Sequence, residues 1–415
     1  MEISQRSCST GGGHLSPQVP LAHFLLSWFK CSIALAVCFL VFHGLCCLNF
    51  VLALQPPGED SPSSKVVRIT YATPQGTASK TGELVIERPG LGYLLLNGDG
   101  ALEVVSPDQF ESLEELSEPL VITPPNELGE KILGEMPVGS KFFSTDHYVV
   151  CYNTTETYAR WNASLYEKRL AGFLKFWQSK GLKLQKPRFP LVAMIFATKE
   201  DYVAYAKQDF EGSEGTFGYY HQSKNRLASY DLTGVEGVLP SGVKVNRDAL
   251  LTTILSRPEA ERTVSTVIHE ASHQMAFNCG LQTRLGDNPL WLSEGIATFF
   301  ETPAGIGKLN TFNYSNLMQT LPARRPDALA TLLIDDSRLR NGETTTIAYA
   351  ESWGLFHFLV NSNPKAMVKY LTLVRKLPIG APADSKERLA LFRACFGEDL
   401  EKMERDFLKH IRKIR

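Results

Sequence analysis

The stretch His269-Glu270-Ala271-Ser272-His273 constrains this chain more than any other feature. Two histidines four residues apart lie on one face of an α-helix, close enough to share a single metal ion. Glu270 follows the first histidine directly, which places it about 100° around the helix. From there its carboxylate can accept a proton from a water on the metal. The pattern predicts a metal site with His269 and His273 as ligands and Glu270 as general base.

The flanking residues favour a helix over residues 257–279. Ser256 and Glu259 form a capping-box pattern, and Pro258 falls in the first turn, where its missing N–H costs nothing. Apolar residues recur at helical spacing, and Gly280 can supply a left-handed C-terminal cap. The alternative is a chance match on a buried helix with two hydrogen-bonded histidines. A third ligand is needed to decide between them.

Glu294 is the candidate third ligand. We expect a helix over residues 289–302, capped by Asn288 and begun by Pro289. Because this segment is strongly apolar, the helix should be buried, and the charge of Glu294 then needs a partner. A metal ion shared with His273 would provide one. Three protein ligands leave a fourth position for water, which is typical of a catalytic rather than a structural zinc site.

The segments HEASH and NPLWLSEGIATFFE together resemble the gluzincin metallopeptidases, including the M1-type aminopeptidases with their HExxH…WLxEGxA pattern. The region from about 140 to 415 is more closely similar to an uncharacterised family of exported, peptidase-MA-like bacterial proteins. The resemblance implies a zincin-like catalytic domain. It also implies that Zn2+ is bound by His269, His273 and Glu294, with Glu270 as general base.

Two further residues follow from the M1-type resemblance. Glu301 matches an acidic position and is a candidate for orienting a ligand histidine, with a solvated surface glutamate as the alternative. Tyr349 aligns with a tyrosine whose hydroxyl donates to the oxyanion, although the Lys-Gly that follows it in that family is absent here. A core tyrosine is the alternative. The chain also lacks the G-x-M-E-N anchor for a free amine, which argues against an aminopeptidase and leaves an endopeptidase open.

Strands and helices alternate before the metal helix, which predicts an α+β fold with a mixed sheet over the active-site helix and a helical subdomain after it. We expect one mixed strand over residues 141–152 and an edge strand at residues 218–221 (GYYH). Such an edge can hold a peptide substrate by strand addition. We expect His221 to be structural or solvent-exposed rather than a metal ligand.

The N-terminus predicts export. Residues 31–54 are almost uncharged and long enough to cross a bilayer, so residues 1–54 are a signal peptide or a membrane anchor. Cleavage near Ala53 is the preferred interpretation, and an uncleaved anchor is the alternative. Either way, the rest of the chain is expected outside the cytoplasmic membrane, in the periplasm or the extracellular space. Residues 55–65 are rich in proline and serine and indicate a linker.

The remaining chain divides in two. Residues 66–136 are expected to form a small β-rich module with short helices, containing a turn at residues 97–100 (NGDG) and a short helix that opens at Ser106. Residues 137–415 are expected to form the gluzincin-like metallopeptidase domain, which ends in a helical part over residues 346–415. The module of residues 66–136 could bind a partner or act as a pro-segment, and the alternative is that it only packs against the rest of the chain.

Composition excludes some partners. The formal net charge is −1, from 43 Lys and Arg against 44 Asp and Glu, and no basic patch favours nucleic acid. Contact with a membrane is expected only through the N-terminal segment. The sparse cysteines beyond residue 50 allow at most one disulfide, and they are Cys151, Cys279 and Cys395.

These features predict an exported zinc-dependent peptidase acting on a peptide or protein substrate, with cell-envelope material as one candidate. One alternative is a non-catalytic extracytoplasmic binding protein that keeps zinc for stability. Another is a zinc hydrolase of a non-peptide amide, such as a cell-wall crosslink.

Overall fold

The computed structural model describes residues 65–88, 90, 92–234, 260–334, 336–381 and 383–414. The expected targeting segment and the capping box at residues 256–259 lie outside the described residues. Within the described ranges, no helix combines the length and the apolar character needed to cross a membrane.

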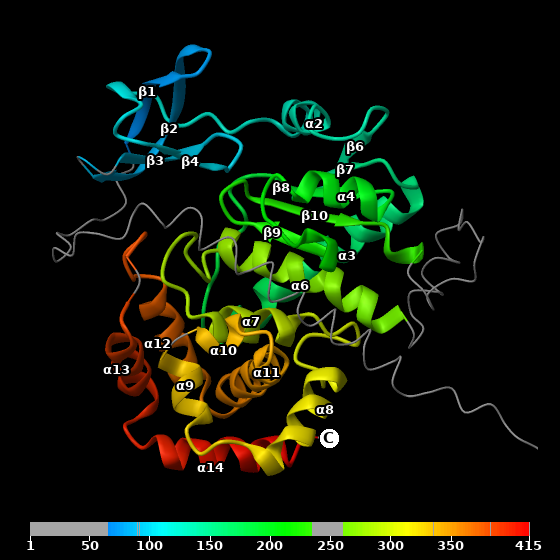
Figure 1. Ribbon diagram of the computed structural model, residues 1–415, viewed down its shortest axis with the longest axis vertical. Coiled ribbons are helices and arrows are strands. Elements are labelled where there is room, and N and C mark those ends of the chain that lie inside the picture. Colours follow the sequence, from blue (N-terminus) through cyan, green and yellow to red (C-terminus); the bar gives the residue numbers. More distant parts are fainter. Residues whose placement is uncertain are drawn as a thin grey trace, which may run out of the picture.

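The first sheet contains five antiparallel strands in the order β4-β3-β2-β1-β5 (Figure 1). They are β1 (Val66–Thr73), β2 (Gly76–Arg88), β3 (Gly92–Asn97), β4 (Leu102–Val105) and β5 (Phe110–Leu116). The prediction of a short helix that opens at Ser106 is wrong. The N–H groups of Gln109 and Phe110 both bond to the Ser106 carbonyl in a single turn, and the chain then pairs with β1. The apolar residues of β5 recur at every third position rather than every second, so its pairing with β1, and not an alternation of polarity, makes this segment a strand.

The second sheet is mixed, with the order β6-β7-β8-β10-β9. Its strands are β6 (Lys141–Ser144), β7 (Tyr148–Tyr152), β8 (Leu191–Phe196), β9 (Gly218–His221) and β10 (Arg226–Tyr230). The three inner strands are parallel, whereas β6 and β9 run antiparallel to their neighbours. The single strand expected over residues 141–152 is instead a hairpin. Glu167 accepts hydrogen bonds from Thr145 Oγ1 and His147 N in the turn, at 2.6 and 2.8 Å, and so stabilises the reversal.

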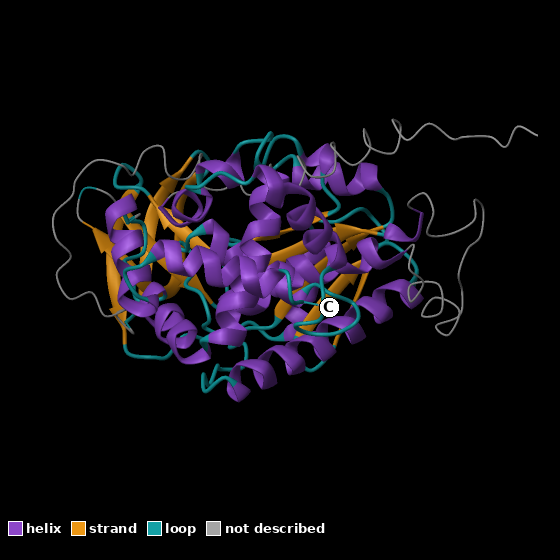
Figure 2. Ribbon diagram, turned by 90° about the horizontal axis from the view of Figure 1, so that it is seen from below, coloured by secondary structure: helices purple, strands orange, loops and turns teal. Residues whose placement is uncertain are grey.

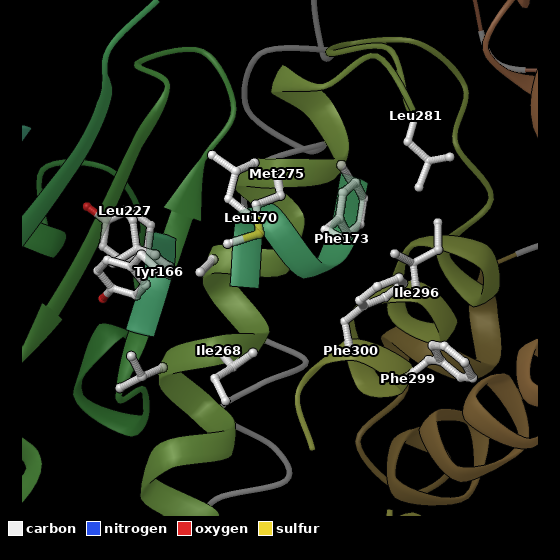
Figure 3. Close-up of a cluster of buried hydrophobic side chains, with 14 of the residues drawn as sticks. Tyr166, Leu170, Phe173, Leu227, Ile268, Met275, Leu281, Ile296, Phe299 and Phe300 are labelled. Atoms are coloured by element: carbon white, nitrogen blue, oxygen red, sulfur yellow. The ribbon is translucent and has the colours of Figure 1, made fainter. Parts of the chain in front are cut away.

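Helices cover both faces of the mixed sheet. On one face lie α3 (Glu156–Ser179) and α6 (Glu261–Asn278), and on the other lie α2 (Pro125–Leu133) and α4 (Lys199–Ala206) (Figure 1). The chain therefore has an α+β fold, with α6 directly beneath β9 and β10. Figure 3 shows apolar side chains of α3, α6 and α7 (Leu290–Phe300) meeting in one core, among them Leu170, Phe173, Ile268, Met275, Ile296 and Phe300.

The chain after α7 is helical. Its helices are α8 (Thr311–Thr320), α9 (Ala328–Ile334), α10 (Ser337–Arg340), α11 (Thr345–Ser362), α12 (Pro364–Val374), α13 (Ser385–Phe396) and α14 (Leu400–Ile411). Short 3-10 turns lie at Ser213–Gly215, Leu232–Gly234 and Leu321–Ala323. Seen from below (Figure 2), helices occupy the near side and the strands lie behind them. At the centre, α11 packs closely on α7. The absence of a side chain at Gly295 allows this approach, since a Cβ there would lie 2.8 Å from the Ser352 carbonyl oxygen.

The turn at residues 97–100 joins the first sheet to the rest of the molecule. Arg284 donates to the Gly100 carbonyl at 2.6 Å, and Lys131 pairs with Asp99 at 2.6 Å. The N–H of Leu102, in β4, donates to the Ser223 carbonyl in the β9–β10 turn at 2.7 Å. The first sheet is thus bonded directly to the connection between the two strands above α6.

The cysteines of the described part are free thiols. Cys151 and Cys279 are buried, and burial raises the pKa of each to about 12. Cys395 is half-buried. Thiols with so high a pKa stay protonated near neutral pH and are poor nucleophiles, which fits a packing role for Cys151 and Cys279.

Gly98 provides a test of the turn at residues 97–100, which joins the first sheet to the rest of the molecule. A Cβ at Gly98 would lie 2.2 Å from the Val121 carbonyl oxygen, a backbone atom that must then shift. We expect Gly98→Ala to lower the free energy of unfolding by about 1–3 kcal/mol, measured by urea denaturation. In the control Gly134→Ala, the new Cβ meets only the Lys131 carbonyl oxygen at 3.3 Å, so stability should stay within about 0.5 kcal/mol. Equal midpoints for the two variants would contradict the tight contact at Gly98.

Candidate metal centre

Two buried helices bring the predicted ligands together. α6 carries His269 and His273 one turn apart, and α7 carries Glu294. The exposed fractions of these side chains are 3%, 3% and 1%. Among the described residues, these three form the group of His, Cys, Asp and Glu side chains whose spacing suits a metal ion, with their ligand atoms all within 4.8 Å of one another.

The separations of the ligand atoms fit one small cation. The Nε2 atoms of His269 and His273 are 3.2 Å apart. Glu294 Oε2 lies 3.3 Å from His269 Nε2, and Glu294 Oε1 lies 3.7 Å from His273 Nε2. Ligands at tetrahedral zinc, each about 2.0–2.1 Å from the ion, are about 3.3 Å from one another. The observed triangle needs little adjustment to reach that arrangement.

The burial of Glu294 is the strongest argument for a cation. In the described part of the chain, neither carboxylate oxygen has a hydrogen bond of regular geometry, and their polar neighbours are the Nε2 atoms of His269 and His273, at 3.3 and 3.7 Å. Burial raises the pKa of this carboxyl, but the charges of His273 and His269 outweigh that effect and lower the pKa to about 2. A buried ionised carboxylate without compensation is unfavourable by several kcal/mol. The donor set, two imidazoles and a carboxylate, matches zinc chemistry.

Glu301 fixes the orientation of His269. Its Oε2 lies 2.6 Å from His269 Nδ1, so the proton on Nδ1 points to Glu301 and the lone pair on Nε2 points to the ligand group. Burial lowers the pKa of His269, but hydrogen bonds to Glu294 and Glu301 raise it well above the usual range. Positive charge is therefore favoured at this point. Glu301 is partly buried at the end of α7, unlike a solvated surface glutamate.

Glu270 lies beside the ligands and contacts the edge of the sheet. Its Oε2 accepts a hydrogen bond from the backbone N–H of Tyr220 in β9 at 3.0 Å. β9 is an edge of the mixed sheet as described, at the position expected for residues 218–221. Burial raises the pKa of Glu270, while the charges of His269 and His273 lower it, with a net upward shift. A raised pKa makes an ionised carboxylate a better proton acceptor.

His221 does not join the metal group. It is buried, its Nδ1 accepts the backbone N–H of Lys224 at 3.1 Å, and its Nε2 lies 3.7 Å from Asp209. Burial lowers its pKa to about 4, so it is neutral near pH 7. These contacts fit the structural role expected for His221. Tyr349 is half-buried on α11, and its role as an oxyanion donor stays a prediction.

The N-terminus of α7 is held differently from what the sequence predicts. Asn288 was the expected cap, but its side chain donates to the carbonyls of Thr283 and Gly286. The cap comes instead from Asp336, whose Oδ1 accepts the N–H of Leu290 at 3.0 Å. The expectation for Asn288 fails because its amide satisfies the preceding loop, which leaves the helix end to a carboxylate remote in sequence. Arg388 of α13 donates to the same Asp336 oxygen at 3.0 Å.

Two contacts of the site have no counterpart in the sequence patterns. One is the N–H of Tyr220 on Glu270, and the other is the side chain of Asn310, which donates to Glu301 Oε1 at 2.6 Å. Asn310 precedes α8 as a plausible helix cap, which is a signal in the sequence for its position. No periodicity links it to Glu301, so its contact with the metal centre is visible only in the folded chain.

Part of this chain matches a protein family, and its structure is similar to solved structures. A family described as a protein of unknown function (DUF1570) matches residues 263–380, which include all the proposed ligands. This match is shorter than the region from about 140 to 415 for which the sequence predicts a family resemblance. No curated protein matches. The similar solved structures include two of a mutant M1 zinc metallopeptidase from Deinococcus radiodurans, one of them bound to a Tyr-Ser-Ala substrate. Each is 13% identical over 85% of this chain, with TM-scores of 0.30 and 0.29, and the present chain spans 63% of their length.

The candidate centre predicts a gain of stability with zinc that depends on Glu294. Zinc at a thousand times its dissociation constant should raise the free energy of unfolding by about 4 kcal/mol, and a chelator should remove that gain. Glu294→Gln removes the carboxylate whose lowered pKa shows that its ionised form stabilises the fold, so in chelator the variant should be less stable than the wild type near pH 7. In zinc the difference should be larger, because the variant loses most of the gain from the metal. Thermal denaturation of both proteins in both conditions measures this, and a parallel response to zinc would contradict the assignment of Glu294.

Proposed function

We propose that this chain is an exported zinc-dependent peptidase. The observation that carries the proposal is the buried triangle of His269, His273 and Glu294 with Glu270 beside it on the same helix. A structural zinc site is usually closed by four protein ligands and has no use for an adjacent carboxylate base. Three ligands with such a base are what hydrolysis by an activated water requires. The resemblance of the two ligand segments to gluzincins points the same way.

The roles of the chain's own groups follow from their positions. When bound, zinc supplies Lewis acidity, which lowers the pKa of water to about 7 and polarises the substrate carbonyl. Glu270 accepts the proton of the attacking water and then passes it to the leaving amine. Its hydrogen bond to the Tyr220 N–H holds the carboxylate in one orientation while leaving its second oxygen for that proton. The hydroxyl of Tyr349 donates to the oxyanion.

The edge strand β9 is the proposed site for the substrate backbone. An extended peptide can add to a free sheet edge through main-chain hydrogen bonds. One constraint applies here, because the outward N–H of Tyr220 is already bonded to Glu270. A peptide lying along β9 therefore forms its pairs on either side of Tyr220 or competes with Glu270 for that donor. In this proposal the general base lies at the middle of the bound peptide.

The zincin-like fold, the export and the substrate class belong to the same proposal. A mixed sheet over the helix of His269, a second ligand helix and a helical part after it is the order expected of a zincin-like domain. The apolar character of residues 31–54 supports export with cleavage near Ala53. We propose a peptide or protein substrate, with cell-envelope material as a candidate and no role for nucleic acid.

Replacing the general base separates metal binding from catalysis. Glu270→Gln keeps the shape of the side chain but cannot accept a proton, so we expect stoichiometric zinc and a loss of hydrolysis by at least about 100-fold. Glu261→Gln is the matched control, the same change in the first turn of α6 away from the ligands, and it should keep full activity. The measurements are metal analysis and digestion of a broad peptide library.

The outcomes of that digest distinguish the alternatives. Full activity of Glu270→Gln on any cleaved peptide would refute the mechanism. Stoichiometric zinc without cleavage of peptides, by either the full chain or a chain trimmed near Ala53, would favour a zinc-containing binding protein. Cleavage of cell-wall fragments alone, lost in Glu270→Gln, would instead identify a hydrolase of a non-peptide amide.

Tyr349→Phe tests the oxyanion donor. The change removes one hydroxyl and keeps the ring that packs against the core, so the fold and the bound zinc should be unaffected. Loss of a donor used only in the transition state should lower kcat by about 100- to 1000-fold with little change in KM. An unchanged kcat on a cleaved peptide would show that Tyr349 is a core tyrosine.

A further inference from the structure

Both N–H groups of the Asn310 side chain donate a hydrogen bond, and its oxygen accepts one. Its Nδ2 donates to Glu301 Oε1 at 2.6 Å and to the Thr298 carbonyl at 3.1 Å. Its Oδ1 accepts the backbone N–H of Asn313 at 3.1 Å, which caps the N-terminus of α8. The reverse orientation of the amide would place an oxygen against two acceptors, so this orientation is the one that the neighbours allow. Asn310 is buried, with an exposed fraction of 6%.

These hydrogen bonds connect Asn310, through Glu301, to the proposed metal ligand His269. Asn310 holds Oε1 of Glu301, and the other oxygen of Glu301 lies 2.6 Å from His269 Nδ1. Both short bonds involve the Glu301 carboxylate, and bonds to an ionised acceptor are about twice as strong as neutral ones. The orientation of His269 Nε2 therefore depends on a carboxylate that Asn310 keeps in one rotamer.

We propose that Asn310 is a positioning residue of the metal centre, acting on His269 through Glu301. The inference rests on the proposed zinc site but not on peptidase activity. Residues that orient a metal ligand typically change metal affinity by about 10- to 100-fold when removed. Because Asn310 stands one bond farther out than Glu301, the expected effect lies near the lower end of that range.

The capping of α8 is a second role of Asn310, and the variant must preserve it. Serine is as good an N-cap as asparagine, but its short side chain does not reach Glu301. Asn310→Ser should therefore keep α8 and weaken zinc binding about 10-fold, measured by competition with a chromophoric chelator. Asn363→Ser is the matched control, because Asn363 caps α12 through the Ala366 N–H, and it should leave zinc affinity unchanged.

The effect of Asn310→Ser on zinc affinity should change sign in a Glu301→Gln background. This change separates a positioning role of Asn310 from a general effect on folding. In Glu301→Gln, a single acceptor oxygen remains, and the Asn310 amide and the Nδ1–H of His269 compete for it. Zinc affinity should fall in this variant, because Asn310 takes the oxygen and the Gln amide then faces Nδ1 of His269. Adding Asn310→Ser frees the oxygen for His269, so zinc affinity should rise rather than fall further. A loss of packing or of the α8 cap would lower it in both backgrounds.

The outcomes are decisive for Asn310 independently of any cleavage. Stoichiometric zinc in the wild type with unchanged affinity in Asn310→Ser would overturn the inference and leave the proposed peptidase standing. The same holds if Asn310→Ser lowers affinity equally in the wild-type and Glu301→Gln backgrounds. A wild type that binds no zinc overturns both. If Asn310→Ser does not fold, an unchanged zinc affinity in Glu301→Gln alone would overturn the inference.

Discussion

A buried carboxylate whose polar neighbours are two imidazoles lies at the centre of this molecule. Glu294 is almost fully buried between His269 and His273, so its charge requires positive charge at the same point. The surrounding structure holds that arrangement in place. Gly295 lets α7 approach α11, and Gln282 donates to Ser293 beside Glu294 at 2.7 Å. At the C-terminal end of α7, the side chain of Glu301 forms a hydrogen bond with His269. Much of the surrounding packing thus keeps this acidic group, Glu294, buried beside the two histidines.

The parts predicted correctly from the sequence depend on local spacing. α6 follows from the recurrence of apolar residues every three or four positions, and Gly280 has the left-handed backbone expected after such a helix, with φ of 77°. α7 follows from its apolar run after Pro289. Because both helices are local in origin, residues at fixed positions on them fall on predictable faces. That is why the convergence of His269, His273 and Glu294 could be expected before the fold was known.

The features that sequence reasoning missed depend on contacts between distant residues. Asp336 caps α7 in place of Asn288, and Asn310 binds Glu301, yet neither pairing has a repeating pattern in the sequence. The division of residues 141–152 into a hairpin depends on Glu167 of α3. The strand β5 was missed for another reason. Its apolar residues recur at every third position, so no strand-like alternation follows the capping pattern at Ser106, and the pairing with β1 makes the segment a strand. Local signals compete, and tertiary pairing decides between them.

The remote cap on α7 has a consequence for the order in which the centre is assembled during synthesis. The growing chain presents His269 and His273 on α6 well before Asp336 and its partner Arg388 have been made. Until then, the first N–H groups of α7 lack the carboxylate that caps the helix carrying Glu294. Two ligands therefore exist early, and the third is fixed only when most of the helical part has been completed. An ion captured by the two histidines alone would be held weakly, so secure loading waits for a nearly finished chain.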